Sequence, residues 1–257
     1  MEPKVIFEDE DLLVLDKPAG VIVNRSDTTK GELTVADFVE KHLNLPTPAP
    51  RPFDPNFKNL DYSLQAEQDF VSRSGIVHRL DKETSGILLV AKTLEAFKNL
   101  QAQFKERKVQ KTYVALAHGK IEPEAGEINV SVGRLPWNRK RFGVIADGRE
   151  STTLYKVLSI QYLVSGREKE PLTLVELTPK TGRTHQIRVH LQYIKHPIFA
   201  DPLYAGRKTS RDDRMLLPRV FLHAAKISFF HPRTSQMLNF QSPLTEDLNQ
   251  FLSTLIS

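Results

Sequence analysis

The chain of 257 residues contains no cysteine, and this absence excludes several kinds of chemistry at once. Disulfide bonds, thiolate nucleophiles, iron–sulfur clusters and thiolate zinc sites all require the sulfur of cysteine. A chain without cysteine also fits a reducing compartment. Apolar runs are short, since none reaches the roughly 18 residues of a membrane-spanning helix, and the first four residues do not begin a signal peptide. We therefore expect a cytoplasmic protein without a membrane partner.

Positive charge is modest in total but unevenly distributed. The net charge is +5, from 36 Lys and Arg against 31 Asp and Glu. Residues 1–70 carry 7 basic and 14 acidic side chains, whereas residues 179–234 carry 11 basic and 3 acidic ones. Residues 98–113 and 134–150 each add five more basic residues. If these segments meet in space they favour a polyanion as partner, although solvated lysine and arginine faces explain the same counts equally well.

Short apolar runs alternate with only a few helical patterns. The alternation predicts strands at 5–8, 12–16, 86–92, 111–118, 127–132, 151–158, 172–178, 220–230 and 237–240. Helices are expected at 33–43, 93–108, 184–195 and after Thr245, with Thr34, Thr93 and Thr245 as caps. Strands in runs with helices between them predict an α+β fold on a mixed, mostly antiparallel sheet. We expect one catalytic domain over residues 1–257, interrupted by an irregular, proline-rich insertion at 44–75.

The densest polar cluster in an apolar setting is His78-Arg79-Leu80-Asp81-Lys82-Glu83-Thr84-Ser85-Gly86. It precedes an apolar strand, which places its charged residues in a loop at the strand's edge. Asp81 lies beside two cations that favour its ionised form, so it is a candidate nucleophile or general base. The alternative is an ordinary turn held by local hydrogen bonds of Asp, Ser and Thr.

A second cluster runs from Lys180 to His190 and combines a glycine, two threonines and two arginines. It is typical of a helix start that binds anions, with Arg183 at the start and Arg188 a turn and a half later. His185 and His190 are five residues apart, which is the wrong spacing for two zinc ligands on one helical face. The chain has neither a P-loop nor a G-x-G-x-x-G motif, so a nucleotide cofactor has no support.

Five segments together resemble the RluA-type pseudouridine synthases. They are LDKPAGVIV, HRLDKETSGILLVAK, KTYVALAHG, TGRTHQIRVHL and FLHAAKISFFHP, in that family's order over nearly the whole chain. The resemblance implies a pseudouridine-synthase-like fold and the isomerisation of uridine to pseudouridine in structured RNA. It also implies that no metal or organic cofactor is needed.

The resemblance assigns roles to individual residues. Asp81 matches the family's essential aspartate and acts as a nucleophile at the ribose C1′ or the base C6, or as a base in a glycal route. Tyr113 matches the tyrosine that packs on the target base, and Arg183 matches the arginine that pairs with the catalytic carboxylate. Arg79 matches the arginine that enters the helix stack when the target nucleotide is flipped out.

The remaining expected RNA contacts adjoin these residues and are Lys82, Lys111, His185 and Arg188. Two segments depart from the family pattern, namely Asn24-Arg25, where many members have His-Pro, and the loop from Ala200 to Gly206. We also expect a stand-alone catalytic domain, because the LDKPAG segment comes near the start of the chain, ahead of which many members carry a small RNA-binding domain. RNA selection would then depend on the catalytic domain's own surface.

Two other functions compete with RNA isomerisation. One is a catalytically idle RNA-binding or ribosome-assembly factor on the same fold, which a damaged Asp, Tyr or Arg would indicate, although all three are present. The other is an N-glycosidase that uses Asp81, which would need a second carboxylate, and Glu83 is the nearest. We expect ribosomal RNA as the first substrate class and transfer RNA as the second, with the chain acting as a monomer.

Overall fold

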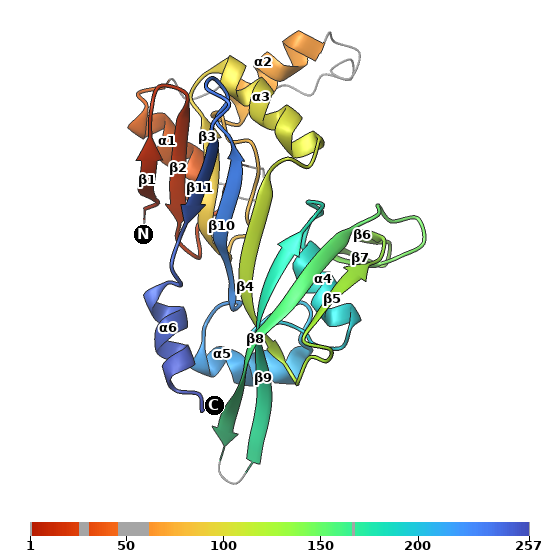
Figure 1. Ribbon diagram of the computed structural model, residues 1–257. Helices are drawn as coiled ribbons and strands as arrows, with labels where there is room; N and C mark the ends of the chain where they lie inside the picture. Colours follow the sequence, from red (N-terminus) through yellow and green to blue (C-terminus); the bar gives the residue numbers. More distant parts are fainter. Residues whose placement is uncertain (1, 26–30, 46–61, 166–167, 257) are drawn as a thin grey trace. The chain divides into compact units, whose positions relative to one another are not determined.

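The chain divides into two compact units (Figure 1). The computed structural model describes residues 2–25, 31–45, 62–165 and 168–256. Unit 1 comprises Met1–Val109 and Ser228–Phe240, and unit 2 comprises Gln110–Ile227 and Gln241–Ser257. A single catalytic domain over the whole chain therefore stays a prediction.

Unit 1 contains a buried antiparallel sheet whose central strands are apolar on both faces. Leu13 pairs with Val90 and Leu15 with Leu88, and all four side chains are fully buried. Continuous apolar runs of this kind are typical of strands covered on both sides. The elements of unit 1 are β1 (Lys4–Glu8), β2 (Leu12–Lys17), α1 (Val35–His42), α2 (Tyr62–Ser72), β3 (Ser85–Ala91), α3 (Leu94–Lys105), the end of β10 (Leu222–Phe230) and most of β11 (Met237–Gln241).

Threonine caps begin two helices of unit 1, as the sequence predicts. The Thr34 hydroxyl accepts a hydrogen bond from the Asp37 backbone, and the Asp37 carboxylate accepts one from the Thr34 backbone at 2.7 Å. Thr93 accepts from the Ala96 backbone at 3.1 Å. These bonds satisfy backbone N–H groups that have no partner inside the helix, so the caps fix where α1 and α3 start.

The prediction of an irregular insertion at 44–75 is wrong for the second half of this segment, because residues 62–72 form α2. Residues 46–61 of that insertion lie outside the described part of the chain. The helix was missed because its apolar stripe is weak, with Leu64 and Val71 half exposed. Its Phe70 ring packs edge-on against Phe97 of α3 at 5.6 Å between ring centroids, a tertiary contact that no local pattern reveals.

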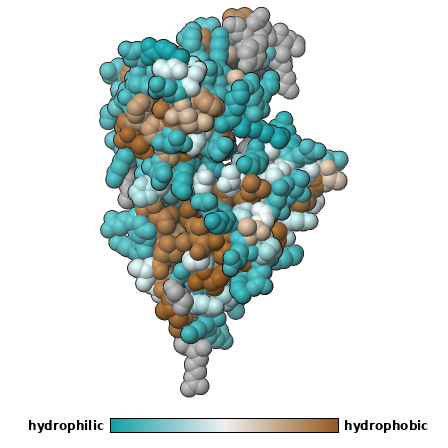
Figure 2. All heavy atoms as spheres, viewed as in Figure 1, coloured by the Kyte–Doolittle hydropathy of each residue, from teal (hydrophilic) through white to brown (hydrophobic). Residues whose placement is uncertain are grey.

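Partly exposed apolar side chains occur on the strands of unit 1. Figure 2 shows apolar surface over the region of β1 and β11, and these strands carry the partly exposed Val5, Ile6 and Met237.

Within the described residues, no helix has both the length and the apolar character needed to cross a membrane.

Unit 2 is built on an antiparallel sheet in the order β10-β4-β9-β8-β5, beside a separate hairpin of β6 and β7. The long partners β8 and β9 exceed their predicted lengths because they continue as a two-stranded ribbon beyond the rest of the sheet (Figure 1). The elements of unit 2 are β4 (Gln110–His118), β5 (Ala125–Asn129), β6 (Val132–Leu135), β7 (Asn138–Val144), β8 (Thr152–Ser165), β9 (Glu168–Pro179), α4 (Gln186–Tyr193), α5 (Arg207–Leu216), the start of β10 and α6 (Glu246–Ser253).

Three elements of unit 2, the strands β6 and β7 and the helix α5, have no counterpart among the predicted ones. The β6–β7 hairpin was missed because its four basic residues obscure the alternation of a strand. Helix α5 was missed because it is charged over most of its length and buries the polar Ser210 and Asp213. The predicted α+β class on a mostly antiparallel sheet is confirmed.

The predicted cap at Thr245 is only partly correct. Helix α6 does begin at Glu246, but the Thr245 side chain makes no capping bond. Its hydroxyl instead accepts a hydrogen bond from the Arg219 guanidinium at 2.7 Å, and Arg219 also pairs with Asp247 at 2.6 Å. A tertiary partner therefore replaces the local cap.

Candidate active site

The HRLD loop of unit 1 lies directly before β3. Asp81 is half-buried between the buried Leu80 and Thr84, and the Thr84 backbone donates to the Asp81 carbonyl at 3.1 Å. On the other side of the loop, the His78 Nε2 atom accepts from the Leu89 backbone at 2.9 Å. The Asp81 loop is thus fixed at both ends against its own unit.

Arg79 and Lys82, the predicted RNA contacts of this loop, are both exposed. The Lys82 ammonium lies 2.6 Å from a Glu32 carboxylate oxygen, in an ion pair whose two side chains are about half exposed. Exposed ion pairs contribute little to stability, roughly 0–1 kcal/mol, so Lys82 can exchange this partner for a phosphate at small cost.

A buried lysine, Lys17, which sequence reasoning missed, binds the backbone of the Asp81 loop. Lys17 is fully buried at the end of β2, and its ammonium donates to the carbonyls of Pro18 (2.8 Å), Val21 (2.8 Å) and Lys82 (3.1 Å). The Gly20 backbone, at a positive φ of 87° that favours glycine, donates to the same Lys82 carbonyl at 2.8 Å. The LDKPAG segment therefore holds the backbone that follows Asp81. The signal in the sequence was a lysine at the end of a mostly apolar strand.

Replacing Lys17 with methionine is expected to lower the free energy of unfolding by about 3 kcal/mol or more, because buried carbonyls lose their donor at roughly 1–3 kcal/mol each. Urea denaturation of the variant measures this loss. The matched control is Lys4→Met at an exposed position of β1, where less than about 0.5 kcal/mol is expected. Equal stability of the two variants would show that the three carbonyls do not depend on Lys17.

Unit 2 brings three of the predicted residues to one end of its sheet. Tyr113 of β4 is buried and pairs with Leu177 of β9. Arg183 follows Leu177 by six residues, in the loop after β9. The Lys111 ammonium lies beside Gly182, only 3.7 Å from the position that a Cβ atom there would occupy. Burial lowers the pKa of Lys111 to about 8, because the charged ammonium loses contact with water.

The buried Gln186 organises the loop that carries Arg183, and sequence reasoning missed this role. Its side-chain oxygen accepts from the Thr181 hydroxyl at 2.7 Å and from the Arg183 backbone at 3.0 Å. Its side-chain nitrogen donates to the Thr152 carbonyl and the Thr153 hydroxyl, both at 3.0 Å. The Arg183 guanidinium itself is half-buried and donates long hydrogen bonds of 3.3 Å to the Glu150 carbonyl. Gln186 thus fixes the backbone from which the Arg183 side chain extends.

Two residues of the same motif are positioned differently from the sequence expectation. Helix α4 begins at Gln186, so Arg183 precedes the helix rather than starting it. Arg188 is buried and forms a two-pronged ion pair with the fully buried Asp201, at 2.7 and 2.8 Å. A buried guanidinium that is paired with a carboxylate stabilises the fold and is not available to RNA. We therefore withdraw Arg188 from the expected RNA contacts. His185 is half-buried, and its Nδ1 atom lies 2.9 Å from the Tyr204 hydroxyl.

One carboxylate–histidine cluster in the described residues has the composition of a metal site, namely Asp9, Asp11 and His231 of unit 1. The His231 Nδ1 atom accepts from two backbone N–H groups, those of Arg233 and Thr234, both at 3.1 Å. Its proton therefore resides on Nε2 and points to Asp9 at 3.0 Å. This arrangement joins two turns by hydrogen bonds and leaves no lone pair of the ring for a metal ion.

Comparison with known proteins relates the whole chain to one family. A family model described as RNA pseudouridylate synthase matches residues 11–193. The chain is 37% identical over 256 residues to ribosomal large subunit pseudouridine synthase D of Nitrosomonas europaea, covering 98% of this chain and 65% of that protein. It is 36% identical over 258 residues to synthase C of Vibrio vulnificus, covering 99% of this chain and 70% of that protein.

Solved structures show the same likeness. Human RNA pseudouridylate synthase domain containing 1 superposes with a TM-score of 0.69 at 26% identity, covering 97% of this chain and 87% of that one. Human RNA pseudouridylate synthase domain containing 4 gives a TM-score of 0.65 at 21% identity, which speaks for the fold alone. The chain spans 60–65% of the length of several curated relatives, including the synthase D proteins of Nitrosomonas europaea and Neisseria meningitidis.

Proposed function

We propose that this chain isomerises uridine to pseudouridine in RNA. The proposal proceeds from its family, because the chain belongs to the RNA pseudouridylate synthases. The observation that carries the proposal is the half-buried Asp81 on a loop fixed by Lys17, Gly20 and His78. A catalytic carboxylate needs such a fixed geometry to approach its target atom productively.

The reaction requires one bond to break and another to form without net oxidation. The glycosidic C1′–N1 bond breaks, the uracil rotates and a C1′–C5 bond forms, after which C5 loses its proton and N1 carries one in the product. We propose that Asp81 acts as nucleophile at C1′ or C6, or as base in a glycal route, since all three use an ionised carboxylate. Tyr113 would pack on the base and Arg183 would pair with the Asp81 carboxylate.

The target uridine must leave its helix before the reaction, because the glycosidic bond is inaccessible in stacked RNA. The exposed Arg79 is suited to fill the vacated space, since a guanidinium plane both stacks on bases and neutralises phosphate. Lys82, Lys111 and His185 complete the proposed RNA contacts. Ribosomal RNA is the proposed substrate, because several curated relatives that match over nearly the full chain are named ribosomal large subunit pseudouridine synthases.

Nucleoside analysis of treated ribosomal RNA distinguishes this function from its two rivals. RNA lacking pseudouridine is incubated with the protein, digested to nucleosides and separated by chromatography. The proposal predicts pseudouridine without free uracil. An N-glycosidase would release uracil, and an idle RNA-binding factor would leave both the uridine and the RNA unchanged. A cytoplasmic location and action as a monomer are proposed along with this function.

The lowered pKa of Lys111 predicts that the RNA affinity depends on pH. With a pKa of about 8, the charged fraction of Lys111 is about tenfold smaller at pH 9 than at pH 7. RNA affinity of the wild type should therefore fall over this range relative to that of Lys111→Arg, because a guanidinium stays charged. Filter binding at constant ionic strength measures both curves. Parallel curves would exclude Lys111 as a charge that RNA senses.

A further inference from the structure

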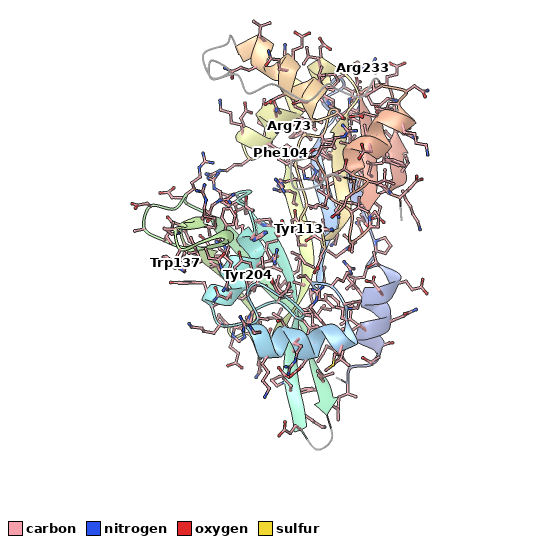
Figure 3. All side chains as sticks on the ribbon, turned by 180° about the vertical axis from the view of Figure 1, so that it is seen from behind. Arg73, Phe104, Tyr113, Trp137, Tyr204 and Arg233 are labelled. Atoms are coloured by element: carbon pink, nitrogen blue, oxygen red, sulfur yellow. The ribbon has the colours of Figure 1, made fainter. Side chains whose placement is uncertain are left out.

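We infer that Trp137, at the tip of the β6–β7 hairpin, is a stacking platform for an unpaired base of the RNA substrate. This inference rests on the proposed function and adds a binding residue to it. Trp137 is the chain's single tryptophan, and 78% of it is exposed. Figure 3 shows it on the hairpin of unit 2. Tryptophan is rarely left so exposed, because its ring gains more from burial than most side chains do.

The turn itself does not explain the tryptophan. Leu135 pairs with Asn138, so Pro136 and Trp137 form a two-residue connection between the strands. Connections of this length favour glycine, asparagine and aspartate, whose backbones suit a tight hairpin. A bulky aromatic ring at this position contributes nothing that the turn needs, which points to a role outside the fold.

The charge of the hairpin indicates the partner. Its 13 residues, 132–144, include four basic side chains and no acidic one. Arg134 and Arg139 are exposed. Arg134 donates to the Arg139 carbonyl at 2.7 Å and lies over the Phe142 ring at 5.0 Å, so its charge is held on the hairpin surface. An exposed indole on a basic hairpin matches single-stranded nucleic acid, which offers a base face and phosphates together.

The hairpin is anchored where it joins the rest of unit 2. Phe142 packs against the buried cluster of Val132, Val189 and Tyr204, and its backbone donates to the Tyr204 hydroxyl at 3.1 Å. The same hydroxyl lies 2.9 Å from His185, directly before α4. The tip is therefore presented from a fixed base, so less freedom is lost when RNA binds than on a loose loop.

The single tryptophan makes the test direct, because all indole fluorescence reports on position 137. The full chain is titrated with a 12-nucleotide oligouridylate, and separately with a blunt RNA duplex of 12 base pairs. Stacking predicts strong quenching by the single strand and weak quenching by the duplex, whose bases are covered. Unchanged fluorescence with the single strand, or equal quenching by both probes, would overturn the inference.

Binding of substitution variants provides the second readout. Trp137→Ala should raise the Kd for oligouridylate roughly 5- to 100-fold, while Trp137→Phe, which keeps a ring, should raise it less. The matched control is Met215→Ala on α5, a side chain that is 77% exposed and should leave the Kd unchanged. If Trp137→Ala binds as tightly as the wild type, or forms dimers less readily while binding RNA normally, the residue serves another purpose.

Failure of this inference is separable from failure of the proposed function. The wild-type preparation used for fluorescence is also assayed for pseudouridine formation in ribosomal RNA. Pseudouridine formation without tryptophan quenching would reject only the role of Trp137. Quenching by oligouridylate without pseudouridine formation would reject the proposed function and keep the stacking role.

Discussion

Asp81→Asn is expected to reduce the rate of pseudouridine formation by a factor of about 10⁴ or more, as is typical when a catalytic nucleophile is removed. Asparagine has nearly the shape of aspartate but carries no charge, so the site loses its proposed reacting carboxylate while the backbone contacts of the loop stay. The Thr84 bond to the residue 81 carbonyl and the Lys17 bond to the Lys82 carbonyl both have backbone acceptors and should persist. Single-turnover measurements with saturating RNA isolate this chemical step.

The control for this variant is Asp69→Asn on α2, which changes the same kind of side chain elsewhere in unit 1. Its rate should stay within about twofold of the wild type, because Asp69 lies on another element and pairs with Arg73 of the adjoining turn. Both variants should bind RNA at least as tightly as the wild type, because each loses a negative charge. A rate for Asp81→Asn within tenfold of the wild type would exclude Asp81 as the reacting carboxylate.

Arg183→Ala is expected to lower the single-turnover rate by roughly 10²–10³, the range seen when one preorganised electrostatic partner is removed. Arg183→Lys should recover only part of this loss, because lysine keeps the charge but lacks the two-pronged fork that matches a carboxylate. The Gln186 bond to the residue 183 backbone should survive both changes, so the loop stays in place. Arg211→Ala, on the exposed side of α5, is the matched control and should react at the wild-type rate.

The double variant Asp81→Asn/Arg183→Ala tests whether the two residues act as one unit. If Arg183 works through the Asp81 carboxylate, its removal should cost little once that carboxylate is gone, because effects within a unit are not additive. Independent action would instead make the two losses multiply. Multiplied losses would contradict the proposed pairing while leaving the importance of each residue intact.

Elements fixed by local interactions could be predicted from the sequence. The capping box of Thr34 and Asp37 defines the start of α1, and the apolar run of β3 could be recognised from seven consecutive residues. Helix α2 was missed because its stability comes from tertiary contacts such as that of Phe70 with Phe97. The Thr245 cap failed for the same reason, since Arg219, 26 residues earlier, occupies its hydroxyl.

The candidate site shows the same limit. Asp81, Tyr113 and Arg183 could be named because motifs carry them. The supporting residues Lys17 and Gln186 could not, because their partners lie as far away as Lys82 and Thr152. The sequence predicts Arg188 to be an anion ligand, because its real partner, the buried Asp201, follows 13 residues later and is brought beside it only by folding.

Release of tritium from ribosomal RNA labelled at C5 of uridine tests the central claim most directly, because the C5 proton leaves only when the base is reattached through that carbon. Wild-type protein is predicted to release tritium in step with pseudouridine formation, and Asp81→Asn is predicted to release almost none. No release by the wild type from unmodified ribosomal RNA, or equal release by Asp81→Asn, would contradict the proposed isomerisation by Asp81.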